Sequence, residues 1–257
     1  MSTRENPTIS LVGAGPGDVE LISVKGLNRL KKAKVVLYDA LVNEELLTYA
    51  PTAKKIFVGK RLGFKAYEQE QINQLMVDSA IEFGHVVRLK GGDSFVFGRG
   101  MEEILFAREH QIPTEVIPGI SSSISVPALA EIPVTHRGIS NSFLVLSATL
   151  ADGSLNPELE KARELNATIV ILMGIAQLPK IVELYQLANK GEIPVSIIYN
   201  GSLETQKEVF GTIDTIVAQN EQASASGPGV IVIGEVVSLA SNYQAKVYSE
   251  SSSSCCI

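Results

Sequence analysis

Short apolar runs alternate with amphipathic stretches along most of the chain, and this alternation is the strongest constraint on its fold. Apolar residues recur at helical spacing over residues 20–33, 67–84 and 99–111. The runs around them read as strands, each ending near a glycine or an acid: residues 8–13, 33–39, 54–59, 85–92 and 114–119. Strands that alternate with helices predict a mostly parallel sheet covered on both faces. Functional groups in such sheets gather beyond the carboxyl ends of the strands.

A second set of strand-like runs begins near Asn141 and comprises residues 141–149, 167–174, 195–202, 207–213 and 229–237. Between the two sets lies a stretch of small residues interrupted by prolines, which indicates a domain boundary. We expect an N-terminal α/β domain over residues 1–118, a C-terminal α/β domain over 119–248, and a disordered Ser/Cys tail over 249–257. Two such domains would leave a ligand cleft between them.

Composition narrows the classes of function. The chain has 257 residues, of which 45% are hydrophobic, enough for a sizeable α/β core. A formal net charge of -6 disfavours a nucleic-acid partner. Cys255 and Cys256 adjoin each other at the end of the sequence and the histidines are scattered, so no metal site is expected. Without a signal peptide or an apolar run of about 20 residues, we expect a cytoplasmic protein with no membrane segment.

The first strand leads into GAGPGD, residues 13–18, a turn close to the Rossmann fingerprint G-x-G-x-x-G. The third glycine, Gly17, comes one residue early. Asp39 ends the second strand roughly 20 residues later, where a ribose-binding acid is expected. Pro16 argues against a dinucleotide site, because it removes a backbone N–H where a pyrophosphate would need a donor. The turn therefore predicts a close approach of backbone to a ligand without identifying the ligand.

A second glycine-rich segment, LKGGDSFVFGRGMEE, follows the fourth strand. Asp93 comes directly after Gly91 and Gly92, where it could cap a turn or accept hydrogen bonds from a ribose. Val96 and Phe97 offer apolar surface to a flat ring such as adenine.

Arg99 stands between two glycines at the start of the next expected helix, followed by Glu102 and Glu103. A guanidinium in such a loop can bind a carboxylate through two parallel hydrogen bonds. The two glutamates would also complement the positive end of the helix dipole.

Several motifs together resemble those of the tetrapyrrole methylase family. They occur in the family's order and span nearly the whole chain: VGAGPGD, VVLYDALV, GGDSFVFGRGMEE, PGISSSIS, IPVTHRG, ILMG and GVIVIGEVV. The resemblance implies two α/β domains with mainly parallel sheets, in the tetrapyrrole methylase fold and not the Rossmann fold, with S-adenosylmethionine held in the cleft. It also implies a homodimer. The sequence departs from the family pattern at Ser94, Met101 and Ser121, of which the last keeps the hydroxyl of the usual threonine.

The activity implied by this resemblance is C-methylation of uroporphyrinogen III at ring carbons 2 and 7, giving precorrin-2. S-adenosyl-L-methionine would be the methyl donor and S-adenosyl-L-homocysteine the second product, with no metal. The product would enter sirohaem or cobalamin biosynthesis. Some relatives are fused to a dehydrogenase–chelatase or a synthase, so this chain would need separate downstream enzymes.

The resemblance also implies the site residues. Those expected to line the donor pocket are Pro16, Gly91, Gly92, Asp93, Val96, Ser121, Ser122, Met173, Gly201, Pro228 and Gly229. Those expected to bind the substrate carboxylates are Arg99, Arg137, Lys60 and Arg61. The candidates for catalysis are Arg99, Glu102 and Asp39, and the two carboxylates are the more natural bases because arginine stays protonated. Met173 could equally be a core residue, and Lys60 with Arg61 a solvated surface pair.

Three other functions stay open. Another precorrin or tetrapyrrole methyltransferase would share the donor site, although the FGRG and THRG segments argue against it. An NAD-dependent oxidoreductase is supported by the first glycine turn and Asp39. A regulator that senses a tetrapyrrole or a nucleotide would bind its ligand without turnover.

Overall fold

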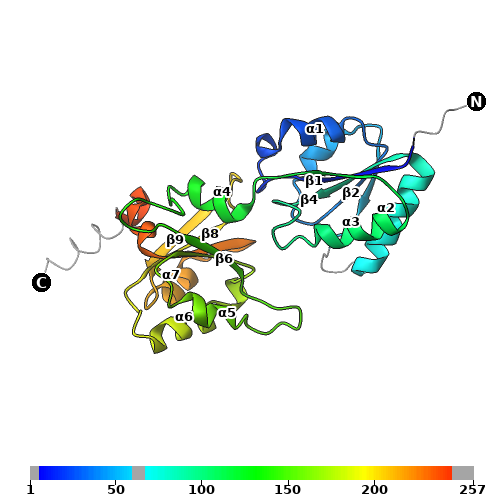
Figure 1. Cartoon of the computed structure of the whole chain (residues 1–257). Helices are drawn as coiled ribbons and strands as arrows, with labels where there is room; N and C mark the ends of the chain where they lie inside the picture. The colour runs from blue at the N-terminus through cyan, green and yellow to red at the C-terminus, as the bar shows by residue number, and fades with distance from the viewer. Residues whose placement is uncertain (1–5, 60–66, 245–257) are drawn as a thin grey trace, which may run out of the picture. The chain divides into compact units, whose positions relative to one another are not determined.

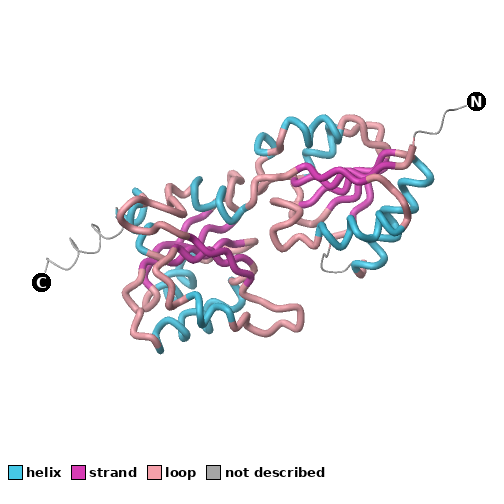
Figure 2. Tube along the Cα trace, viewed as in Figure 1, coloured by secondary structure: helices cyan, strands magenta, loops and turns pink. Residues whose placement is uncertain are grey.

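A computed structural model describes residues 6–59 and 67–244 of the chain. The chain divides into two compact units, the first ending at Ser121 and the second beginning at Ser122. Each unit is built on a five-stranded sheet with helices on both faces (Figures 1 and 2). Lys60, Arg61 and the tail over 249–257 lie outside the described residues. Within the described part of the chain, no helix has the length and apolar character needed to span a membrane.

The first sheet is parallel throughout, with strand order β3-β2-β4-β1-β5. Its strands are β1 Thr8–Gly13, β2 Val35–Tyr38, β3 Lys54–Phe57, β4 His85–Lys90 and β5 Thr114–Ile117. Each strand falls within one of the runs predicted from the sequence, which confirms the expected parallel sheet. The most protected position belongs to β4, which has β2 on one side and β1 on the other.

Helices cover both faces of the first sheet, and neighbouring strand residues point to opposite cores. On one face, α1 Val24–Leu30 and the 3-10 helix η2 Glu44–Tyr49 bring Leu30 and Leu46 against Val12. On the other face, α2 Gln69–Phe83 and α3 Gly100–Glu109 pack over a core that contains Leu11. Figure 1 shows α1 on one side of the strands and α2 with α3 on the other. A further 3-10 helix, η1 Val19–Leu21, follows the first turn.

The second sheet is mixed, with strand order β6-β7-β10-β8-β9. Its strands are β6 Phe143–Ser147, β7 Thr168–Leu172, β8 Pro194–Tyr199, β9 Lys207–Thr212 and β10 Gly229–Ile233. The expected α/β architecture is confirmed, and β6, β7 and β8 run in one direction, but β9 and β10 run against them. The connection over residues 200–206 explains the reversal at β9, because a parallel crossover needs about a dozen residues or more.

Helices also cover both faces of the second sheet (Figure 1). One face carries α4 Ser122–Leu129 and η4 Glu235–Leu239, and the other carries α5 Glu158–Ala162, η3 Ile175–Gln177, α6 Leu178–Leu187 and α7 Ile216–Ala223. The sequence did not predict α4, whose serines and Pro127 are weak helix formers. Burial of Val126 against β10 residues overrides that local preference.

A cluster of ion pairs joins helix α1 to the edge strand β5 of the first sheet. Glu115 of β5 accepts hydrogen bonds from Arg29 Nε at 2.6 Å and Arg29 Nη2 at 3.0 Å, and Lys25 Nζ lies 2.6 Å from the same carboxylate. Hydrogen bonds from Arg29 and then Lys25 lower the pKa of Glu115 to about 2. A depressed pKa means that the folded state favours the ionised carboxylate, so this interaction stabilises the fold only while Glu115 is charged.

We expect Glu115→Gln to lower the free energy of unfolding by about 1 kcal/mol at pH 7, because the carboxylate is partly exposed. The stabilisation is present above the unfolded-state pKa of about 4.3 and is lost as pH falls toward 2, so the difference from wild type should shrink across that window. Urea unfolding at pH 7, 4.5 and 3 measures this difference, with Glu183→Gln, at an exposed position of α6, as the control. A difference that is constant with pH would contradict the ion-pair explanation.

Candidate functional site

The functional loops of the first unit meet at one edge of its sheet. All five strands are parallel, so the segments that follow β1, β2, β4 and β5 emerge at the same carboxyl edge. The GAGPGD turn, Asp39, the GGDSFVFGRG segment and the PGIS segment are therefore neighbours, although more than a hundred residues separate the first from the last. This edge is the candidate site of the first unit.

Three of these loops touch through their backbones at glycines. Gly15 and Gly92 exchange hydrogen bonds, with N···O distances of 3.2 Å and 2.7 Å. A Cβ atom on Gly119 would lie 2.1 Å from the Gly92 carbonyl oxygen, and one on Gly13 would lie 2.5 Å from Gly119 Cα. No side chain fits at Gly13 or Gly119 without moving backbone. Gly13 and Gly15 of the first turn thus allow the backbones of these loops to pack against each other.

Asp93 links the loop after β4 to the loop after β5 by hydrogen bonds. Its Oδ1 accepts a hydrogen bond from Phe95 N at 2.8 Å, and its Oδ2 accepts one from Gly119 N at 3.0 Å. Both carboxylate oxygens are therefore engaged with backbone amides of different segments. The sequence pointed to a turn cap or a ribose contact, and the structure shows the turn cap together with a link to the loop after β5.

The loop before α3 holds Arg99 in an unfavourable backbone conformation. Phe97 and Arg99 have φ angles of 53° and 58°, in the left-handed region that non-glycine residues rarely adopt. Gly100 N donates to Ser94 O at 3.0 Å, and a Cβ atom on Gly98 would lie 2.6 Å from that same oxygen. The chain thus winds tightly around one carbonyl group. Strained non-glycine residues of this kind cluster at ligand-binding segments.

The Arg99 side chain forms a two-pronged ion pair with Glu102 in the first turn of α3. The Nε–Oε1 and Nη2–Oε2 distances are 2.8 Å and 2.6 Å, and each side chain is about half exposed, at 55% and 52%. The hydrogen bonds lower the pKa of Glu102 and raise that of Arg99. Arg99 is therefore a permanent cation, and Glu102 in this pair is a weak base that holds the guanidinium through two hydrogen bonds.

Four charged side chains meet beneath α3, at the end of the central strand. Arg88, 2% exposed, donates from Nε to Glu103 Oε1 at 2.9 Å and from Nη2 to Asp39 Oδ1 at 2.6 Å. Lys90 Nζ donates to Glu103 Oε1 at 3.0 Å and lies 3.7 Å from Asp39 Oδ2. Glu103 is fully buried, whereas the Asp39 side chain is 29% exposed. Burial opposes ionisation of Arg88, but the two carboxylates outweigh it and raise its pKa.

Sequence patterning points to Asp39 in this cluster but not to Arg88 or Lys90. A signal was present, because charged residues at alternate positions of a central, otherwise apolar strand require buried partners. Glu103 was read as a helix-dipole complement, and its local position in the first turn of a helix gives no indication that it is buried. Its partners come from a strand that precedes it in the chain.

The candidate residues of the second unit gather at an edge of its own sheet. Met173 follows β7 with a φ of 55° and a 56% exposed side chain, so it is not a core residue. Asn200, which follows β8, donates its N–H to Pro228 O at 2.9 Å, directly before β10. A Cβ atom on Gly201 would lie 2.5 Å from Val126 Cγ2 of α4, so this glycine lets the loop after β8 approach that helix.

The remaining nominated residues lie in the connecting segments. Ser121 is buried and Ser122 begins α4. Arg137 is exposed at the tip of a tight turn closed by His136 N donating to Ser140 O at 2.9 Å. At the carboxyl edge of the first sheet, the structure brings together the catalytic candidates Asp39, Arg99 and Glu102 with the donor-pocket candidates Pro16, Gly91, Gly92, Asp93 and Val96. In the second unit, it brings together the donor-pocket candidates Met173, Gly201, Pro228 and Gly229. Lys60 and Arg61 lie outside the described residues.

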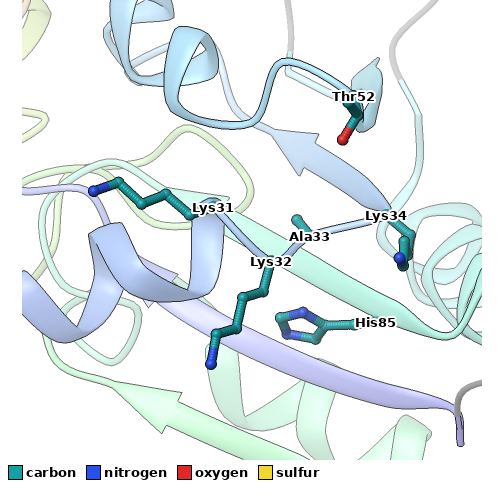
Figure 3. A pocket seen from close by; sticks show the side chains of 6 residues that line it. All are labelled: Lys31, Lys32, Ala33, Lys34, Thr52 and His85. Atoms are coloured by element: carbon teal, nitrogen blue, oxygen red, sulfur yellow. The ribbon is translucent and has the colours of Figure 1, made fainter.

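A hollow of about 410 Å³ lies at the opposite, amino edge of the first sheet (Figure 3). It is lined by Lys31, Lys32, Ala33, Lys34, Thr52 and His85. Lys31 caps the C-terminus of α1, where cations complement the negative end of the helix dipole. Lys31 thus has a structural explanation, and the hollow is separate from the loops at the carboxyl edge.

Known proteins resemble this chain over most of its length. The profile of the family described as Tetrapyrrole (Corrin/Porphyrin) Methylases matches residues 8–217. A uroporphyrinogen-III C-methyltransferase of Methanocaldococcus jannaschii is 51% identical over 235 residues, covering 90% of this chain and 97% of that protein. The corresponding protein of Methanobacterium ivanovii is 45% identical over the same shares of both chains.

Solved structures agree with the sequence comparison. A uroporphyrin-III C-methyltransferase from Thermus thermophilus, crystallised with S-adenosylhomocysteine, superposes with a TM-score of 0.78 at 36% identity, covering 90% of this chain and 99% of that one. The two-unit fold, the motif order and the matched length all agree with this relationship. The chain belongs to the tetrapyrrole (corrin/porphyrin) methylase family.

Proposed function

We propose that this protein transfers methyl groups from S-adenosyl-L-methionine to ring carbons 2 and 7 of uroporphyrinogen III, giving precorrin-2. The observation that carries the proposal is Arg99, a cation kept at a left-handed backbone position at the carboxyl edge of the first sheet. Two relatives named uroporphyrinogen-III C-methyltransferase are 51% and 45% identical to this chain over nearly their whole length. A polycarboxylate substrate needs such cations in a protein whose net charge is -6.

The residues at this edge fit a donor with a flat base and polar groups. The glycine contacts leave backbone rather than side chains at the surface, while Pro16 and Val96 are half-buried beside them. A bound S-adenosylmethionine supplies an electrophilic methyl group. We assign to Pro16, Gly91, Gly92, Asp93 and Val96 the task of holding it in the first unit. Ser121, Ser122, Met173, Gly201, Pro228 and Gly229 are the further donor-binding candidates.

Arg99 acts on the substrate as an electrostatic anchor and not as a base. Its guanidinium is always protonated, and Glu102 raises its pKa further. A substrate carboxylate offers the same two-oxygen geometry as Glu102, so it can replace Glu102 as the partner of Arg99. Arg137, Lys60 and Arg61 are the other candidates for carboxylate binding.

We assign to Asp39 the role of the base that accepts the proton released from the methylated ring carbon. Its side chain is partly exposed at the loop edge and is oriented by Arg88 at 2.6 Å. Glu102 is paired with Arg99, which lowers its pKa, and the proposal keeps Glu102 as the partner that holds this guanidinium. Positioning of the reacting atoms supplies the remainder of the catalysis. A homodimer, a cytoplasmic location and separate downstream dehydrogenase and chelatase enzymes remain predictions.

Anaerobic incubation with uroporphyrinogen III and methyl-labelled S-adenosylmethionine, followed by mass analysis, tests the proposed reaction. Two added methyl groups, located by NMR at carbons 2 and 7, are the expected result. Binding of S-adenosylhomocysteine without transfer would favour a sister methyltransferase that acts on another tetrapyrrole. Thermal protection by a nicotinamide cofactor and not by S-adenosylhomocysteine would favour the oxidoreductase.

We expect Arg99→Ala to lose most methyl transfer while it keeps donor affinity. A charge-assisted contact contributes about 1.5–3 kcal/mol, so kcat/KM should fall roughly ten- to hundredfold. Steady-state kinetics and calorimetry with S-adenosylhomocysteine measure the two effects. Arg108→Ala, an exposed arginine on the same helix, is the matched control. Unchanged turnover in Arg99→Ala would remove Arg99 from the substrate site.

We expect Asp93→Ala to weaken binding of S-adenosylhomocysteine by roughly tenfold, since a lost charged acceptor costs on the order of 1.5 kcal/mol. The physical reason is the release of Gly119 N and of the loop after β5. Calorimetry measures the dissociation constant, and thermal unfolding verifies the fold. Exposed Asp78→Ala on α2 is the control. An unchanged dissociation constant would exclude Asp93 from donor binding.

A further inference from the structure

Two consecutive glutamates in the first turn of α3 have opposite environments. Glu102 is half exposed and paired with Arg99, whereas Glu103 is fully buried beneath the helix. Glu103 Oε1 accepts hydrogen bonds from Arg88 Nε at 2.9 Å, Lys90 Nζ at 3.0 Å and Gln69 Nε2 at 3.3 Å. Burial of a carboxylate removes its hydration, and the surrounding cations and hydrogen-bond donors compensate for that loss.

The same two cations also hold Asp39. Arg88 Nη2 lies 2.6 Å from Asp39 Oδ1, and Lys90 Nζ lies 3.7 Å from Asp39 Oδ2. Arg88 and Lys90 are therefore shared between a buried carboxylate and a partly exposed one. The charges in this group of four side chains balance, with two cations and two anions.

We propose that Glu103 is a positioning residue, which acts through Arg88 and Lys90 to set the orientation and the proton affinity of the Asp39 carboxylate. The inference deepens the proposed function and rests on it, because it gives Asp39 the task of accepting the proton. Without Glu103, two cations would face Asp39 alone and would reduce its proton affinity. Glu103 competes for both cations and so preserves the basicity of Asp39.

Among the residues that the structure describes, the charged groups paired with Asp39 or with its two cations come from β4 and α3. Arg88 and Lys90 belong to β4, and Glu103 belongs to α3. The residues of α2 that reach the cluster, Gln69 and Asn73, are uncharged and bond to each other at 3.0 Å. The first turn of α3 therefore carries both Glu102, which holds the anchor Arg99, and Glu103, which sets the electrostatics of Asp39.

Two substitutions with opposite expected signs test the proposal. Glu103→Gln keeps the size of the side chain and removes its charge, so Asp39 should titrate about one pH unit lower. Lys90→Met removes a cation, so Asp39 should titrate at higher pH than in wild type. Carboxyl NMR of ¹³C-aspartate-labelled full-length protein measures both shifts, with the Asp39 signal assigned by its absence in Asp39→Asn.

Three controls keep this test decisive. Glu103→Asp retains the charge and should restore most of the wild-type titration if Glu103→Gln alters it. Glu109→Gln makes the same chemical change at an exposed position of α3 and should have no effect. Circular dichroism identifies any variant that fails to fold; if Glu103→Gln does so, Lys90→Met and Glu103→Asp carry the test. Shifts in the same direction for Glu103→Gln and Lys90→Met, or no shift in either, would overturn the proposal.

The kinetic readout is separate from the titration. In an active enzyme, the acidic limb of the kcat–pH profile should move in the same direction as the Asp39 titration in each variant. A wild-type protein that does not methylate uroporphyrinogen III would contradict the proposed function, whatever the NMR result. Titration shifts of the expected sign with an unmoved acidic limb would overturn the link between Glu103 and catalysis.

Discussion

The neutralisation of two buried cations at the end of β4 is the constraint on which the candidate site depends. Arg88 and Lys90 occupy the central strand of a parallel sheet, where an unpaired charge would be strongly unfavourable. Their carboxylate partners come from the end of β2 and the first turn of α3. The position of α3 over the sheet is thus coupled to charge pairing as well as to apolar packing. The loop that contains Arg99 leads directly into α3. The same charge pairing therefore determines where this loop ends.

The glycine contacts provide the second constraint, which is steric. Gly13, Gly92 and Gly119 belong to three loops whose backbones touch, and Asp93 ties the second of these loops to the third. Charge pairing beneath α3 and backbone packing between the loops act on the same edge from different sides. Together they form an edge whose surface consists mainly of main-chain atoms, with a few charged side chains such as Asp39 and Arg99.

The sequence predicted the strands better than it predicted their partners. Hydrophobic patterning located all ten strands of the described part of the chain, because burial of alternating or continuous apolar residues is a local signal. The antiparallel course of β9 and β10 and the helix α4 were not predicted, since both depend on packing between distant segments. At the candidate site, patterning nominated Asp39, Asp93 and Arg99, whose functions stay predictions. It gave no indication that Arg88, Lys90 and Glu103 form a buried cluster, because a buried charge can be interpreted only when its partner is known.

The left-handed conformation of Arg99 has a consequence for how this protein can evolve. A non-glycine residue in this region carries a penalty of roughly 1–2 kcal/mol that glycine would relieve. A search for stabilising substitutions would therefore reach position 99 early and would replace the guanidinium with hydrogen. The role proposed for Arg99 therefore places stability and activity in conflict at this position, because selection for thermal robustness alone would tend to remove the proposed substrate anchor.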